Sequence, residues 1–186
     1  GSTTARRLES LHLERKGFPK HREMRQVMGY GNRLYLAKDK GFEQAPFNDQ
    51  LARTGWAWGA TSFDFDNDKD VDIYVANGHL SQESAKDYCT KFWRHDIYTG
   101  NSQLDPTLGI LFQKSFFKDG KMSWNGFEHN FLLLNENDGG FRNIGFLTGT
   151  GFEFDSRSVI GDDLDGDGRV DLIVFEANIM SPHAYD

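Results

Sequence analysis

Two acidic segments of this chain repeat the same spacing of aspartates, and this repeat constrains the fold more than any other feature. Residues 64–72 and 163–171 each place aspartates at positions 1, 3, 5 and 9, and a run rich in β-branched residues follows each segment. Phe42 precedes Asp64 by 22 positions, and Phe141 precedes Asp163 by 22 positions. Matched spacing of several features predicts a true internal repeat, in which each copy is one supersecondary unit.

Each copy has the pattern of a set of short strands. An apolar run leads through a polar turn to Gly41-Phe42 in the first copy and to Gly140-Phe141 in the second, which predicts a β-hairpin. Another short strand, the acidic loop and a β-branched strand follow. We therefore expect four strands and no long helix in each repeat, over residues 29–79 and 129–178. Four short strands per repeat are typical of a propeller blade. The expected fold class is all-β, with β-propeller-type blades in a partial propeller or fragment and a helical insertion.

Residues 80–128 separate the two repeats and are predicted to be an insertion. Its first half predicts an amphipathic helix, with Ser81 as the N-cap and apolar residues at helical spacing. Those apolar residues are Ala85, Tyr88, Cys89, Phe92 and Trp93. Its second half has apolar residues over 108–117 and ends in Asp119-Gly120, which predicts a hairpin before Met122. Residues 1–28 form an amino-terminal arm with a helix expected near 4–15, and residues 179–186 form a tail.

The two acidic loops predict calcium sites. Crowded aspartates repel one another at neutral pH unless a cation neutralises them. Ca²⁺ takes six to eight oxygen ligands in flexible geometry, whereas Mg²⁺ demands a rigid octahedron. Carboxylates at positions 1, 3, 5 and 9 and the carbonyl at position 7 are the expected ligands. The first site takes Asp64, Asp66, Asp68, the Asp70 carbonyl and Asp72, and the second takes Asp163, Asp165, Asp167, the Arg169 carbonyl and Asp171.

Position 6 of such a loop favours glycine, because the turn there requires a positive φ. The second loop has Gly168 at this position and the first has Lys69, so we expect the first site to be weaker or distorted. An EF-hand is excluded because position 12 is Val75 in one loop and Val174 in the other, where a bidentate glutamate is needed. The alternative to a metal site is a pair of solvated acidic turns.

The strand–Asp-x-Asp-x-Asp-Gly-x-x-Asp–strand pattern resembles the FG-GAP/VCBS repeat of calcium-bearing β-propellers. Residues 54–61 and 155–158, which precede the two loops, are similar to the cartilage acidic protein type, whose members often carry an ASPIC/UnbV domain. The resemblance covers about half the chain and departs at Lys69, at the long insertion and in the lack of an ASPIC/UnbV segment. It implies a multi-bladed extracellular or periplasmic propeller with structural calcium and a binding or adhesive role.

Composition excludes several other classes. The formal net charge is −7, which disfavours a basic nucleic-acid surface. One cysteine, Cys89, excludes an internal disulfide framework and a cysteine-based zinc cluster. No apolar run approaches the length of about 18 residues that a membrane span needs. The 16 Phe, 6 Tyr and 4 Trp residues supply enough apolar surface for a core.

The sequence predicts a calcium-stabilised module for extracellular binding, adhesion or assembly, with a protein or carbohydrate ligand. A propeller normally has at least about four blades, so the chain is a fragment, a chain that closes with other chains, or a compact two-repeat domain. The alternative function is a propeller-type polysaccharide lyase or hydrolase with calcium near its substrate. That alternative would require Arg94, His95 and Tyr98 to converge in one pocket, since no catalytic motif is recognised.

Overall fold

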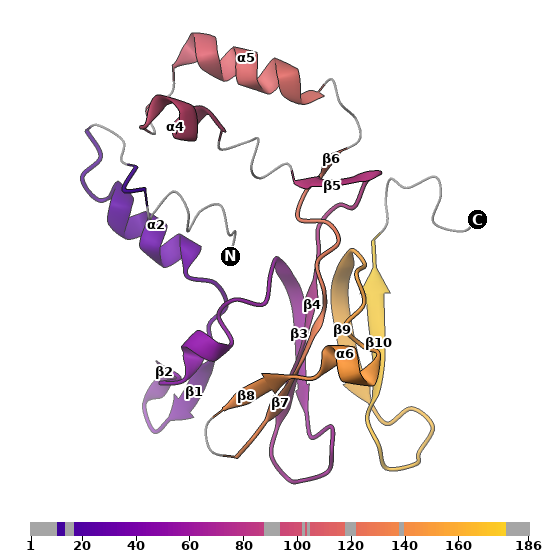
Figure 1. Ribbon diagram of the computed structural model, residues 1–186. Coiled ribbons are helices and arrows are strands. Elements are labelled where there is room, and N and C mark those ends of the chain that lie inside the picture. Colours follow the sequence, from indigo (N-terminus) through magenta and orange to yellow (C-terminus); the bar gives the residue numbers. More distant parts are fainter. Residues whose placement is uncertain are drawn as a thin grey trace.

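The computed structural model of the chain describes residues 11–13, 17–87, 94–101, 103, 105–117, 122–137 and 140–177 (Figure 1). The fold is mainly β, as predicted, with few helices and four small sheets. The first repeat forms β1 (Tyr35–Lys38), β2 (Gly41–Gln44), β3 (Ala57–Phe63) and β4 (Asp72–Asn77). The second repeat forms β7 (Phe131–Asn135), β8 (Phe141–Asn143), β9 (Ser156–Asp162) and β10 (Asp171–Glu176). Each repeat thus has the four strands that its sequence predicts.

The four strands of one repeat do not form one sheet, and the expectation that each repeat is its own blade is wrong. The largest sheet has the antiparallel order β3-β4-β7-β8, so it joins the second half of the first repeat to the first half of the second. The β1–β2 and β9–β10 hairpins remain two-stranded among the described residues. The four-stranded sheet therefore begins in the middle of one repeat and ends in the middle of the next, because β4 pairs with β7 across the insertion.

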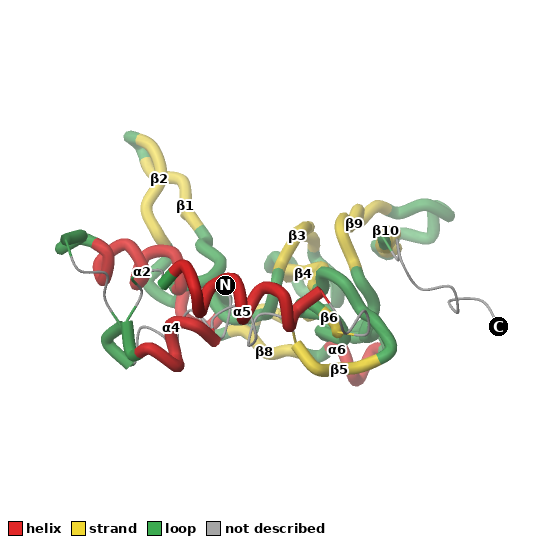
Figure 2. The backbone as a smooth tube through the Cα atoms, turned by 90° about the horizontal axis from the view of Figure 1, so that it is seen from above, coloured by secondary structure: helices red, strands yellow, loops and turns green. Residues whose placement is uncertain are grey.

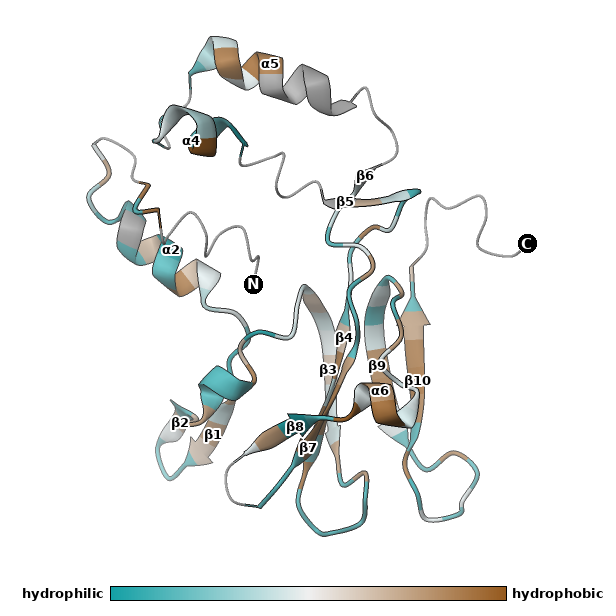
Figure 3. Ribbon diagram, viewed as in Figure 1, coloured by the Kyte–Doolittle hydropathy of each residue, from teal (hydrophilic) through white to brown (hydrophobic). Residues whose placement is uncertain are grey.

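The core lies on both faces of the four-stranded sheet. On one face, Tyr74, Ala76 and Leu132 are fully buried and pack with Val159 of β9. On the other face, Val75, Leu133 and Leu51 are buried beneath Leu34 and Phe47. Figure 2 shows β3 and β4 between the β1–β2 hairpin and the β9–β10 hairpin, and Figure 3 shows hydrophobic residues along much of β10.

Two glycines allow β3 and β9 to approach closely. A Cβ at Gly59 would lie 3.0 Å from the Ser158 Cα, which is backbone and cannot move aside. A Cβ at Gly161 would lie 2.9 Å from the ring of Phe63. The contact between the two repeats is therefore as tight as the backbone permits.

The first half of the insertion departs from its predicted helix. Residues Ser84–Asp87 form a strand, β5, which pairs in parallel with β6 (Met122–Ser123). Ser81 does not cap a helix, because its backbone N–H and its hydroxyl both donate to the carboxylate of Asp155 at 2.7 and 2.8 Å. Pairing with a distant strand overrides the local helical spacing here. Tyr88, Cys89, Phe92 and Trp93 lie outside the described residues, and α4 (Arg94–Thr99) follows them.

The second half of the insertion is helical, so the expectation that the apolar run over 108–117 leads into a hairpin at Asp119-Gly120 is wrong for that run. Pro106–Phe117 form α5. The Asp105 carboxylate accepts the backbone N–H groups of Thr107 and Leu108 at 2.9 and 3.0 Å, so it is the N-cap, and proline follows at the first helical position. Asp119-Gly120 lies outside the described residues.

Two further helices complete the described structure. The helix expected near residues 4–15 falls largely outside the described residues, and the arm instead forms α2 (His21–Gly29). The second repeat contains the one-turn helix α6 (Gly145–Thr148), and a 3-10 turn, η1 (Asn48–Gln50), occupies a similar place in the first.

The insertion leaves the sheet through a narrow neck. Leu80 and Trp124 form an isolated antiparallel bridge, in which each backbone N–H donates to the carbonyl of the other at 2.9 and 2.8 Å. The N–H of His79 donates to the carbonyl of Asn125 at 2.9 Å. These bonds bring together two positions separated by the whole insertion.

Candidate metal centres

The two acidic loops lie at the same end of the molecule. One joins β3 to β4 and the other joins β9 to β10, and both project from the end opposite α4 and α5 (Figure 1). In each loop the flanking strands are antiparallel partners, with Phe63 opposite Asp72 and Asp162 opposite Asp171. The hairpin therefore fixes the distance between the two ends of the loop.

The first aspartate of each loop organises its backbone. The Asp64 carboxylate accepts the N–H groups of Asp68 and Lys69, each at 3.0 Å. The Asp163 carboxylate accepts the N–H groups at the same two positions, Asp167 at 3.1 Å and Gly168 at 2.9 Å. The position-1 carboxylate thus curls the loop around itself in both repeats.

The fifth and ninth positions are also used alike in the two loops. The ninth carboxylate accepts the N–H at position 2, from Phe65 to Asp72 at 2.8 Å and from Leu164 to Asp171 at 3.0 Å. The fifth carboxylate accepts the N–H at position 7, which belongs to Asp70 in one loop and to Arg169 in the other. The equivalence inferred from spacing therefore extends to individual hydrogen bonds.

Each loop gathers three carboxylates that could hold one cation. Oxygens of Asp64, Asp66 and Asp72 lie within 4.8 Å of one another, as do oxygens of Asp163, Asp165 and Asp171. Asp68 and Asp167, which were also predicted ligands, do not belong to these triads. Oxygen-only donor sets of this kind suit a hard divalent cation.

The backbone turns of the two loops match at positions 4 and 6. The φ angles are +62° and +78° at Asn67 and Lys69, and +77° and +86° at Gly166 and Gly168. Lys69 therefore adopts the left-handed conformation that its position predicts. The expected distortion of the first loop is wrong, because its hydrogen bonds follow the same scheme as those of the second.

We expect Lys69→Gly to raise the free energy of unfolding by about 1 kcal/mol, because a left-handed conformation costs a residue with a Cβ roughly 1–2 kcal/mol. The matched variant Gly168→Ala should lower it by a similar amount, since nothing lies within 4 Å of the added Cβ and only the backbone is strained. Chemical denaturation of both variants measures the difference. Destabilisation by Lys69→Gly would contradict a left-handed Lys69 in solution.

The first loop is anchored more deeply than the second. Asp72 is fully buried, and besides Phe65 it accepts the N–H of Asn135 on β7 at 2.8 Å. The side-chain amide of Asn137 donates to Asp68 at 3.1 Å. No local spacing could reveal Asn135 and Asn137, because the whole insertion lies between them and the loop.

Asp70 adds a further carboxylate to the first loop. Both of its carboxylate oxygens are shielded from solvent and have no hydrogen-bond partner among the described residues. Burial raises the pKa of Asp70, and the charges of Asp68 and Asp72 raise it further. Burial and the charge of Asp68 also raise the pKa of Asp66. The loop therefore concentrates negative charge.

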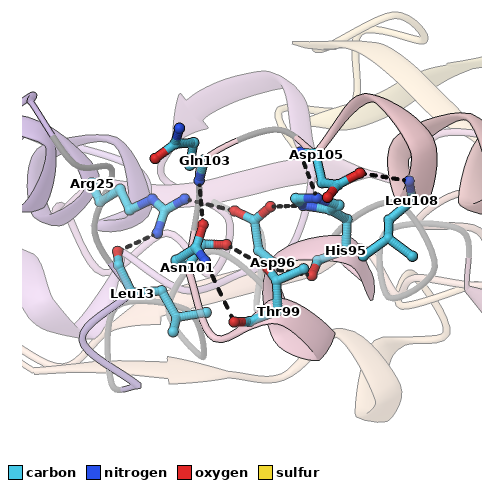
Figure 4. A network of polar contacts seen from close by, with 9 residues as sticks. All are labelled: Leu13, Arg25, His95, Asp96, Thr99, Asn101, Gln103, Asp105 and Leu108. Atoms are coloured by element: carbon cyan, nitrogen blue, oxygen red, sulfur yellow. Dashed lines mark hydrogen bonds and ion pairs between the residues drawn. The ribbon is translucent and has the colours of Figure 1, made fainter.

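The residues of the enzyme alternative do not converge. His95 is buried, while Arg94 and Tyr98 are exposed. Figure 4 shows that the His95 ring joins neighbouring segments: Nδ1 lies 3.1 Å from the Asp96 carboxylate, and Nε2 accepts the N–H of Asp105 at 3.1 Å. Asp96 in turn pairs with Arg25 of α2 at 3.1 Å. This network holds α2, α4 and the start of α5 together.

Three of the four tryptophans gather around His79. The His79 ring stacks on Trp124 with a centroid separation of 5.1 Å and meets Trp56 edge-on at 5.5 Å. Trp58 lies 5.5 Å from the same ring and carries the Arg157 guanidinium at 4.9 Å. Burial, followed by the charge of Arg157, lowers the pKa of His79.

Within the described residues, no helix combines the length and the hydrophobicity that crossing a bilayer would require. Comparison of the chain with family models, with curated proteins and with solved structures finds no match.

Proposed function

We propose that this chain is a calcium-stabilised β module of the FG-GAP/VCBS type, whose sheets are propeller-type blades and whose role is binding, adhesion or assembly outside the cytoplasm. The β3-β4-β7-β8 sheet supports the blade assignment, because it is a four-stranded antiparallel sheet built from consecutive repeats. The exposed loops and the insertion would supply the surface for a protein or carbohydrate ligand.

One observation carries the proposal: two loops in different hairpins arrange their carboxylates by the same hydrogen bonds into two triads. A solvated acidic turn has no need of such a scheme, because its carboxylates would separate into water.

Calcium would act in this module as a clamp on each hairpin. The triad in each loop joins two residues after one strand to the residue that begins the next strand. A cation held there closes the hairpin end and offsets the repulsion among carboxylates. Its carboxylates would then be unavailable as general acids or bases, which supports a structural role.

We expect the folded protein to bind two calcium ions, and native mass spectrometry with titration calorimetry measures the number. Asp66→Asn and Asp165→Asn should each reduce it to one, because asparagine keeps an oxygen acceptor but loses the charge. Asp162→Asn is the matched control, since Asp162 adjoins the second loop but lies outside both triads, and it should leave two. No bound calcium in the parent protein would overturn the proposal.

A further inference from the structure

Apolar residues that are buried at the contact between the two repeats have equivalents in the second repeat that are exposed. Tyr74 and Ala76 on β4 are fully buried against β9 and β10. The residues 99 positions later on β10 are Ile173 and Phe175, which are 36% and 49% exposed. Ile160 on the paired strand β9 is 48% exposed. The face of the sheet that is covered in the first repeat is thus an open apolar face in the second.

The other half of the same contact is only partly covered in the first repeat, where Val75 is buried beneath Leu34 but a cleft of about 350 Å³ remains. One wall is Asn32–Leu34, just before β1, and the other is formed by Ala60, Ile73 and Val75. These three residues correspond to Val159, Leu172 and Val174, with which the second repeat packs onto the first. The cleft therefore occupies the place at which a preceding β-hairpin would lie.

The strand edges beside these two faces are also open. β10 and β1 each have a strand partner on one side only among the described residues. In the first repeat the strand equivalent to β10 is β4, and its edge is occupied because it pairs with β7. The paired residues are Ile73 with Leu133, Tyr74 with Leu132, and Val75 with Phe131. An open edge with an apolar face beside it is a template for another strand.

The register of the missing pairing follows from the repeat. Ala45 donates its N–H to the carbonyl of Leu34 at 2.9 Å, and Ile144 donates to that of Leu132 at 2.8 Å, so Leu34 and Leu132 are equivalent. The N–H of Leu34 is also taken, by the side chain of Asn48. Because neighbouring residues of a strand point their polar groups to opposite sides, those of Arg33 and Tyr35 face the open edge.

One oxygen of the Asp171 carboxylate accepts no hydrogen bond among the described residues, and the same strand pairing would supply a donor for it. Its equivalent, Asp72, uses both oxygens, accepting the N–H of Phe65 in its own loop and of Asn135 on the adjacent strand. Asp171 accepts only the N–H of Leu164 among the described residues. The residue equivalent to Asn135 is Ala37, which pairs with Phe42 as Asn135 pairs with Phe141.

We infer that the β9–β10 hairpin of one copy of this chain docks into the cleft of a second copy, where β10 pairs antiparallel with β1. Leu172, Ile173 and Val174 then lie opposite Tyr35, Leu34 and Arg33 of the second copy, and the order β9-β10-β1-β2 reproduces that of β3-β4-β7-β8. A second copy is the occupant because this chain carries both the open edge and the apolar face that the cleft requires. The contact is head-to-tail, so it repeats from copy to copy and gives a ring where the rotation closes and a filament where it does not. The inference rests on the assembly role within the proposed function.

Disulfide cross-linking tests the register. In a background with Cys89→Ser, the variants Leu34→Cys and Ile173→Cys are prepared separately and mixed in calcium under mild oxidation. The polar groups of Leu34 point away from the new partner, so the two residues form a non-hydrogen-bonded pair with Cα atoms about 4.5 Å apart, within disulfide range. We expect a cross-linked dimer. The matched control replaces Leu34→Cys with Leu36→Cys, two positions out of register, and should cross-link at least tenfold less.

Sedimentation velocity supplies a measurement that needs no cysteine. Phe175→Asp should weaken self-association at least tenfold, whereas Met28→Asp, at an exposed position on α2, should leave it unchanged. A monomeric parent chain, or equal cross-linking of the two cysteine pairs, would overturn the inference. Calcium counting separates it from the proposed function. Two bound ions without association reject the docking alone, and association without bound calcium rejects the calcium site alone.

Discussion

Removal of calcium with EGTA should lower the thermal unfolding midpoint by about 20 °C. A ligand that binds only the folded state stabilises it by about 4 kcal/mol when its concentration is a thousand times its dissociation constant, and each loop offers one such site. For a chain of this size, 1 kcal/mol corresponds to about 2–4 °C. Differential scanning calorimetry with saturating calcium and with EGTA measures the shift.

Two controls make the calcium result specific. The double variant Asp66→Asn/Asp165→Asn removes one charge from each triad, so its midpoint should differ little between calcium and EGTA. Magnesium at the same concentration should stabilise the parent protein less, because a loop of backbone-held carboxylates does not enforce octahedral geometry. An unchanged midpoint in EGTA would show that the acidic loops are solvated turns.

Asp72→Asn should lower the free energy of unfolding by about 3 kcal/mol in EGTA, whereas Asp171→Asn should cost about 1 kcal/mol or less. Asp72 is fully buried and satisfies two backbone N–H groups, so an amide N–H in place of one oxygen leaves a buried donor unpaired. Asp171 satisfies one such group at an accessible position. Urea denaturation at low protein concentration measures both variants.

The comparison isolates the hydrogen bonds from electrostatics. Without calcium, each substitution also removes one negative charge from its acidic loop, and this relief of repulsion is larger in the first loop, where Asp70 adds a carboxylate, so it works against the loss expected for Asp72→Asn. The difference between the variants therefore reports the tie from Asp72 to β7. Equal losses would contradict the role of Asp72 in joining the first loop to the next strand.

The repeats could be predicted from the sequence because their signals are local. Glycine at a turn, alternation of apolar residues and the spacing of aspartates all act within a few residues, and the structure places eight strands where these patterns predict them. The left-handed backbone of Lys69 was predictable for the same reason, since Gly168 occupies the matching position of the second loop.

What could not be predicted depends on contacts between distant segments. Which strands share a sheet is decided by the pairing of β4 with β7. Residues 84–87 form the strand β5 because they pair with β6. Neither partner lies near in sequence. The helix α5 is a different case, because Asp105-Pro106 is a local signal for the start of a helix, whereas the Asp-Gly pair after the apolar run favours a hairpin.

The neck formed by Leu80 and Trp124 makes the chain between them a replaceable cassette. Its ends meet in a two-residue bridge, so a replacement segment that keeps this bridge and the Ser81–Asp155 bonds beside it still closes as a loop on the sheets, losing only the pair between Asp96 and Arg25 of α2 among the contacts described above. The entropy lost on closing a loop grows only with the logarithm of its length, and doubling the length costs about 0.6 kcal/mol. Natural variation or engineered grafting at this junction can therefore change what the module displays without disturbing the strand register that shapes the acidic end.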